Sequence, residues 1–334
     1  MFASRPQRLL FELLAAASAV FVVIHSHLVP ALLGGLVAYI ISCSVQSSAQ
    51  RRRHRWPQWV TYSLAAVAAL ASITALIGGV FAAFRSVDIA GLSVSVIKGL
   101  EALHLMLPPA LENYLPAGSG SVQAALAGFV SSKSEMIRGA GMGILHGTVH
   151  TIIGAVVGLM LSFEKICPAH PAALRIAEMA SGLVLAFRGV MVAQAKISAI
   201  NATLTGIFLL GVMPLLGFQL PLAKSLVLLT FVVGLLPVLG NLISNSAITL
   251  VALLVSPVAA AIALAFLVVV HKLEYFLNAR IVGGEIGAKA WELLLAMLVA
   301  EASFGIPGLV VAPVAYVWLR DMTVADNAAE AGSP

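Results

Sequence analysis

The sequence predicts an all-α, polytopic integral membrane protein with about eight transmembrane helices. Of its 334 residues, 60% are hydrophobic and only 10% are charged. The mean hydropathy is +1.03, and apolar runs of spanning length recur along the chain. Because an average soluble domain is about 25% charged, so few charges cannot cover the surface of a water-soluble protein of this size. The composition therefore excludes a soluble globule, a disordered chain and a collagen-like chain.

Residues 1–84 are predicted to form the first three spans, since a spanning helix needs about 20 mostly apolar residues. The runs Leu9–Ile24 and Leu28–Ser44 are separated by a short polar turn and should pack as a tight pair. The basic cluster Arg51–Arg55 follows, and Thr61–Phe84 is the third run. Such clusters are typical of cytoplasmic rims.

Residues 85–143 differ from the runs around them. They carry basic and acidic residues in equal number and are interrupted by Pro108, Pro109 and Pro116. The apolar residues of 94–107 fall on one helical stripe. We expect a small extramembrane helical module.

Residues 144–320 are predicted to form the transport core, followed by a polar tail over 321–334. The fourth span is Gly143–Ser162, and the amphipathic stretch 168–196 is predicted to be an interfacial helix. Four further apolar stretches follow it: Ile197–Gly217, 222–255, Val258–Leu277 and Trp291–Leu319. Counting 222–255 and 291–319 as one crossing each gives eight spans.

The basic residues also predict the orientation. With eight crossings they lie mainly on one side, which the positive-inside rule identifies as the cytoplasm. We therefore expect a multi-pass protein of a bacterial-type inner (plasma) membrane with both termini cytoplasmic. The alternative for 222–255 and 291–319 is that each is a re-entrant hairpin.

Two Pro/Gly breaks within apolar segments are the first candidate site. A break leaves backbone groups unpaired, which is tolerated at membrane depth only within protein or along a water-filled cavity. Secondary transporters build binding sites from such broken helices. The alternative is that the breaks are simple kinks. The predicted solute or ion pathway consists of Pro237, Gly240, Asn241, Asn245, Thr249, Glu301, Gly305, Pro307 and Gly308.

Glu301 lies ten residues into an apolar run, directly before the second break. Desolvation disfavours a charged carboxylate, so Glu301 is predicted to bind and release a proton near neutral pH. The alternative is a fixed ion pair with Arg280 or Lys272.

Four further groups are candidates for a proton relay. His146 and His150 share a helix face with Gly154 and Gly158, whose spacing favours close helix packing. His271 and Glu274 lie together later in the chain. The alternatives are packing histidines for the first pair and a helix end at the interface for the second.

Several chemistries lack a sequence signal. The two cysteines cannot form a four-ligand zinc site, and His146 and His150 lack the glutamate of a zinc-protease motif. We find no nucleotide-binding fingerprint and no nucleophile–base pair. We therefore predict no metal, no cofactor, no nucleic-acid partner and no enzymatic activity.

Three motifs in the last third of the chain resemble the AI-2E family of transporters. They are 235–241 (LLPVLGN), 278–283 (NARIVG) and 304–309 (FGIPGL), the last closing on Ala312 and Pro313. The order of spans and the extramembrane segment extend the resemblance over most of the chain.

The resemblance implies export of autoinducer-2 and, in some members, sodium or lithium/proton antiport. It also implies a homo-oligomer, with a pentamer as the suggested assembly. We therefore predict a secondary transporter that exports a small polar, autoinducer-2-like molecule across the inner membrane and is coupled to H⁺ or another ion. The alternatives are a Na⁺(Li⁺)/H⁺ antiporter and a non-transporting membrane scaffold.

Overall fold

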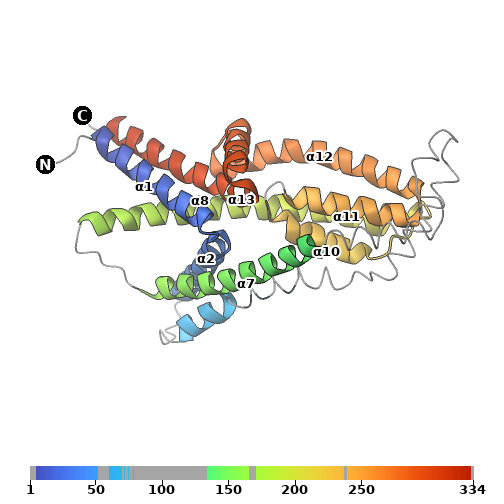
Figure 1. The fold of residues 1–334 in the computed structure, drawn as a ribbon, viewed down its shortest axis with the longest axis horizontal. Helices are drawn as coiled ribbons and strands as arrows, with labels where there is room; N and C mark the ends of the chain where they lie inside the picture. The colour runs from blue at the N-terminus through green and yellow to red at the C-terminus, as the bar shows by residue number, and fades with distance from the viewer. Residues whose placement is uncertain are drawn as a thin grey trace. The chain divides into compact units, whose positions relative to one another are not determined.

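The structure is a computed structural model that describes residues 5–51, 60–69, 71, 74, 78, 134–164, 171–236 and 239–331 (Figure 1). These residues are almost entirely helical and contain no strand. Five of their helical stretches are long and apolar enough to cross a membrane: Gln7–His25, Val29–Ser48, Leu145–Phe163, Ala173–Leu215 and Ala290–Val324. The predicted all-α membrane class is thus supported. The count of eight spans stays a prediction.

The chain divides into two compact units. Among the described residues, unit 1 contains 5–75, 146–193 and 278–331, and unit 2 contains 134–145 and 194–277. Each is described by itself. The predicted module 85–143 lies almost wholly outside the described residues, apart from 134–143, which begin a long helix.

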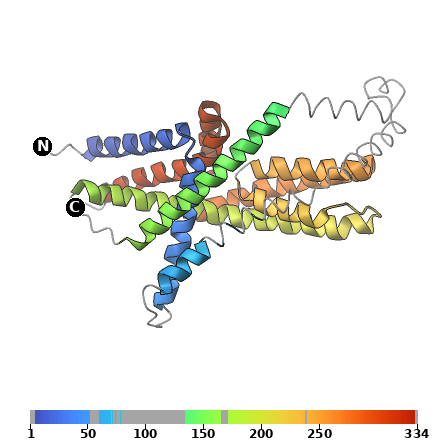
Figure 2. The same ribbon diagram turned by 60° about the horizontal axis from the view of Figure 1, so that its bottom comes forward.

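Unit 1 begins with two helices, α1 (Arg5–His25) and α2 (Val29–Arg51). They are joined by a three-residue turn in which His27 adopts a left-handed conformation with φ of 56°. The two predicted helices and the turn between them are confirmed, but the predicted tight pairing is wrong, because α2 runs away from α1 after the turn, as Figure 2 shows. α1 also lies along α13 (Ala290–Ala331), as Figure 1 shows.

α2 crosses α7 (Ser134–Phe163) closely, and Figure 2 shows the crossing. A Cβ atom at Gly154 would overlap the carbonyl oxygen of Ala31, and one at Gly158 would overlap that of Gly35. The close packing predicted for these two glycines is confirmed. One turn further along, the hydroxyl groups of Ser42 and Ser162 share a hydrogen bond of 2.7 Å.

α8 (Pro171–Ile207) is one continuous helix. We expected an interfacial segment to end and a span to begin at residue 196. Neither Gly nor Pro interrupts the helix there, so α8 continues through this position. The buried residues Val190, Ala193 and Ile197 continue one face through this point. The apolar stretch Ala173–Leu215 is 43 residues long, or about 64 Å at 1.5 Å per residue. That is about twice the thickness of a hydrocarbon core.

α8 ends in a π-helical turn, η1 (Phe208–Val212), and a short α9 (Met213–Leu215). The Met213 N–H donates to the Phe208 carbonyl oxygen, five residues back. This wider turn precedes Pro214, whose ring would collide with the carbonyl group of a regular α-helix. The helical stretch continues through Pro214 and ends at Leu215.

α10 (Ala223–Gly234) and α11 (Leu239–Val255) follow as a helical hairpin. α10 has 12 residues and α11 has 17, or about 18 and 26 Å. Each is shorter than the about 30 Å of a bilayer core.

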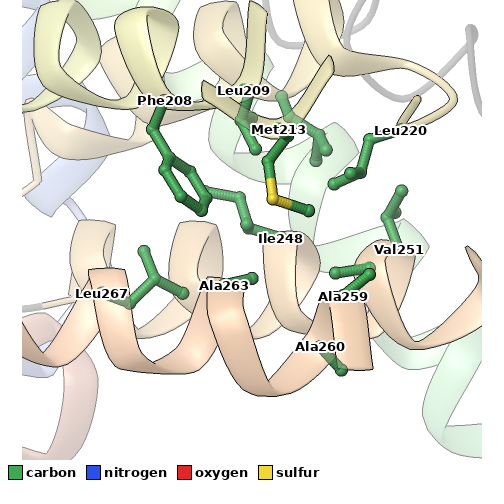
Figure 3. Close-up of a cluster of buried hydrophobic side chains, with 12 residues drawn as sticks. Phe208, Leu209, Met213, Leu220, Ile248, Val251, Ala259, Ala260, Ala263 and Leu267 are labelled. Carbon is green, nitrogen blue, oxygen red and sulfur yellow. The ribbon is translucent and has the colours of Figure 1, made fainter. Parts of the chain in front are cut away.

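The first two-thirds of α12 (Pro257–Ile286) belong to unit 2. It extends through 278–286, where we expected a polar loop, and leaves a loop of only Gly287–Lys289. Figure 3 shows the apolar core of this unit, in which Phe208 and Met213 face Ile248 and the small residues of α12.

α13 is itself a hairpin, because Gly305 interrupts it with φ of 65° and ψ of −150°. This region of backbone conformation is essentially restricted to glycine. The Tyr316 hydroxyl donates to Glu292 Oε2 at 2.8 Å, which brings the two arms together at their base. The predicted break at Gly305 is thus confirmed, whereas the predicted polar tail continues α13 as far as Ala331.

Candidate functional site

A stripe of polar side chains runs along α8 within unit 2. Spacings of four, three and four residues place Gln194, Ser198, Asn201 and Thr205 on one helix face. Ser198, Asn201 and Thr205 are buried, and Gln194 is half-buried. Buried polar groups need hydrogen-bond partners, so the neighbours of this α8 polar stripe are informative.

The stripe binds the carboxyl end of α10. Gln194 Nε2 donates to the Gly234 carbonyl oxygen at 2.7 Å, and Ser198 Oγ donates to the Phe231 carbonyl oxygen. The last four carbonyl groups of any α-helix lack partners within the helix. In α10 the remaining two, of Val232 and Val233, accept hydrogen bonds from the turn. Every carbonyl group at this helix end is therefore paired.

The stripe also reaches the amino end of α11. Asn201 Nδ2 donates to Asn241 Oδ1 at 3.4 Å. In this arrangement the Asn201 amide nitrogen is the donor and the Asn241 amide oxygen is the acceptor. In it, Asn201 Oδ1 is buried and has no hydrogen-bond partner among the described residues, although the residue is only 5% exposed.

Gly240 allows the two helices to meet closely beside these amides. A Cβ atom there would overlap the Val233 carbonyl oxygen and the Gly234 Cα atom. Gly240 is buried, and Ser244 and Ile248 continue its face along α11. The apolar cluster of Figure 3 packs against the same face and holds the hairpin in place.

The structure thus brings two of the predicted residues, Gly240 and Asn241, into one polar cluster with α8. Asn245 and Thr249 are half-buried on the following turns of α11. Pro237 lies outside the described residues. We call the α8 polar stripe together with the turn of the α10–α11 hairpin the hairpin site.

The second break lies in unit 1 and has a different character. Glu301 and Gly305 are exposed, Pro307 is half-buried, and Gly308 is buried where a Cβ atom would overlap the Ala300 carbonyl oxygen. Glu301 makes no hydrogen bond or ion pair with another described side chain. Because the protein does not bury Glu301, its role as a proton-binding group stays a prediction.

The proposed relay residues fall in both units. His146 is exposed and His150 half-buried on α7 in unit 1, whereas His271 is exposed on α12 in unit 2. The Glu274 side chain lies outside the described residues. The relay therefore also stays a prediction. Among the described residues, no group of three or more His, Cys, Asp or Glu could hold a metal ion.

A cavity of about 160 Å³ lies in unit 1 between α1, α2, α8 and α13. Its walls are aliphatic side chains and the ring of Trp318, whose Nε1 donates to the Met179 carbonyl oxygen at 2.9 Å. These walls offer a polar solute no hydrogen bond. This cavity is therefore a poorer candidate than the hairpin site for binding a polar solute.

Sequence reasoning missed Gln194, Ser198, Asn201 and Thr205. The signal was present, since polar residues at helical spacing in an apolar helix predict a polar stripe. The expected boundary at residue 196 divided that stripe between two segments.

Comparisons with protein-family models, with curated proteins and with solved structures found no match to the chain. The resemblance to the AI-2E family therefore rests on features of the sequence alone and stays a prediction.

Proposed function

We propose that the protein is a secondary transporter that exports a small polar molecule across the inner membrane, coupled to a proton or another ion. The observation that carries the proposal is the hairpin site, in which polar side chains of α8 bond the carboxyl end of α10 and the amino end of α11. Polar groups within a membrane protein are costly and are typical of solute pathways.

The lengths of α10 and α11 support this proposal. Each helix is too short to cross a bilayer alone, and the pair turns back at Gly234–Gly240. We propose that the pair is a re-entrant hairpin that ends within the membrane. Its turn then exposes helix ends at membrane depth, where transporters bind solutes and ions. Asn201 and Asn241 would contact the solute there.

The experiment is a flux measurement in proteoliposomes with an imposed pH gradient. Autoinducer-2 is the first solute, because the AI-2E resemblance suggests it, and Na⁺ and Li⁺ are measured in parallel. Asn241→Leu should lower solute flux at least tenfold, since it removes the partner of Asn201. Thr203→Val is the matched control, because Thr203 lies exposed on α8 and bonds only its own helix, at Ala199.

Glu301→Gln tests the coupling separately. If Glu301 carries the proton, the variant should retain solute binding but lose the response of flux to the pH gradient. If the wild-type protein moves neither autoinducer-2 nor Na⁺ nor Li⁺ under any gradient, the transport proposal fails and the alternative of a membrane scaffold is favoured.

A further inference from the structure

Asn201 of the hairpin site has a buried hydrogen-bond acceptor without a partner among the described residues. The residue is only 5% exposed, yet its Oδ1 accepts no hydrogen bond from any described residue. A buried acceptor without a donor destabilises a protein and needs an explanation, such as a bound water molecule or ligand. We propose that Asn201 Oδ1 is the acceptor for a hydroxyl group of an uncharged, hydroxylated solute.

Two neighbouring donors of the α8 polar stripe are engaged elsewhere. Ser198 donates its hydroxyl proton to the Phe231 carbonyl group, and the Gln194 amide donates to that of Gly234. The Asn201 amide nitrogen itself donates to Asn241. These bonds complete the backbone of the hairpin, and no described residue supplies a donor to the buried Asn201 Oδ1.

The charge of the surroundings favours an uncharged solute. Between Gln194 and Leu273 the sequence contains no Asp or Glu. A buried cation would therefore lack a counter-ion, which costs much free energy. A hard cation also needs about six oxygen ligands, whereas Asn201 Oδ1 is the one buried side-chain oxygen without a partner among the described residues. One free acceptor matches one hydroxyl group.

Neighbouring polar groups would select among hydroxylated solutes. Thr205 lies one turn from Asn201 on the same buried face, and Asn245 lies one turn beyond Asn241 on α11. A solute with several hydroxyl groups can contact more than one of these side chains. The inference therefore names small polyols and sugars as the solute class of the proposed transporter, and it rests on that proposed function.

The test uses erythritol and ribose as probes. Proteoliposomes containing the full chain are exposed to each solute, and the rate of osmotic re-swelling, corrected for empty liposomes, reports solute entry. Asn201→Leu should reduce protein-dependent entry of both at least tenfold, and Thr203→Val should leave it within twofold of wild type. Na⁺ and Li⁺ uptake are measured as separate arms.

A second readout distinguishes a solute contact from a structural role. The double variant Asn201→Leu with Asn241→Leu removes both amides of the pair and with them the buried Asn201 acceptor. Its melting temperature in detergent should equal or exceed that of the wild type, although its entry rates for erythritol and ribose are lost. A lower melting temperature together with unchanged entry rates would identify a structural, water-bridged amide pair and overturn the inference.

The two proposals fail in different ways. If the wild type moves erythritol or ribose but Asn201→Leu moves it equally well, only the role of Asn201 is wrong. If the wild type moves Na⁺ or Li⁺ and neither probe, the proposed solute class is wrong while transport stands. If it moves none of them and no autoinducer-2, both proposals are wrong.

Discussion

Two helical hairpins among the described residues, α10–α11 and the two arms of α13, differ in where their contacts lie. The turn of α10–α11 is held at its tip, by Gln194 and Ser198 of α8. The α13 hairpin is held at its base, by the bond from Tyr316 to Glu292, and the residues at its tip are exposed. One turn is thus an ordered polar site, whereas the other presents apolar and acidic side chains outward.

Glycine has a different purpose in each hairpin. Gly240 provides space, because its α-helix packs directly against the backbone of α10. Gly305 provides a conformation, because its φ and ψ suit no other residue, and no atom lies within 4 Å of a Cβ built there. The molecule thus combines one hairpin held by α8 near its turn with one in which Glu301 and Gly305, at the tip, are exposed. The comparison predicts different responses to equivalent substitutions.

The largest effect is expected from Gly240→Ala. Its methyl group would overlap the Val233 carbonyl group, so α10 and α11 must separate. We expect a loss of about 3 kcal/mol in the free energy of unfolding, at the upper end of the usual range for overpacking. Unfolding by SDS, monitored by circular dichroism, measures it.

Gly143→Ala is the matched control for this prediction. Gly143 is helical and has no atom within 4 Å of a built Cβ. Alanine there should stabilise the protein slightly, since it favours the helix over glycine by about 1 kcal/mol or less. Equal destabilisation by the two substitutions would show that Gly240 is not a position of close approach.

Gly305→Ala should cost about 2 kcal/mol through backbone strain alone. Because the surrounding space is open, a larger side chain at this position, as in Gly305→Leu, should cost little more than alanine does. At Gly240 the same enlargement should prevent folding. The SDS titration compares Gly240→Ala, Gly240→Leu, Gly305→Ala and Gly305→Leu. If the free energy of unfolding fell steeply with side-chain size at residue 305, the distinction between the hairpins would be wrong.

The fold was predictable where local signals are strong. Gly305 interrupts a helix through its own backbone conformation, and the interruption is where the sequence predicts it. Helix continuity was less predictable. Charged residues such as Lys196 and Arg280 suggested boundaries, but good helix formers surround them, and the helices continue.

The site was predictable only in part, for a physical reason. Asn241 was noticeable because it follows a Pro–Gly break. Asn201 was not, since its partner is 40 residues away in sequence and a single amide in an apolar helix has many possible explanations. Whether helices far apart in the sequence form hydrogen bonds depends on how they pack. The hydrophobic periodicity of a single helix does not reveal that packing.

Ser198→Ala should have a smaller effect than either glycine substitution. It leaves the buried Phe231 carbonyl group without its donor, at a cost of about 1.5 kcal/mol. Thr203→Ala, on the exposed face of α8, should cost less than about 0.5 kcal/mol, since surface changes rarely exceed that. If thermal melts of the two variants coincide, the α8 polar stripe does not stabilise the hairpin.

The smallest effect is expected from Tyr316→Phe, which removes one hydrogen bond at the base of the α13 hairpin. The bond is to a carboxylate that water screens, so its loss should cost less than the loss of the buried bond of Ser198. Glu292 Oε2 also accepts from the Lys289 backbone N–H at 3.1 Å, so the carboxylate keeps a partner in the variant. A double-mutant cycle with Glu292→Ala isolates the contact, and a coupling energy near zero would mean that the arms are held by apolar packing alone. The ring of Phe304 meets that of Phe21 edge-on, with 5.9 Å between the ring centroids. In that case this apolar contact holds the tip, and Phe304→Ala should lower the free energy of unfolding more than Tyr316→Phe does.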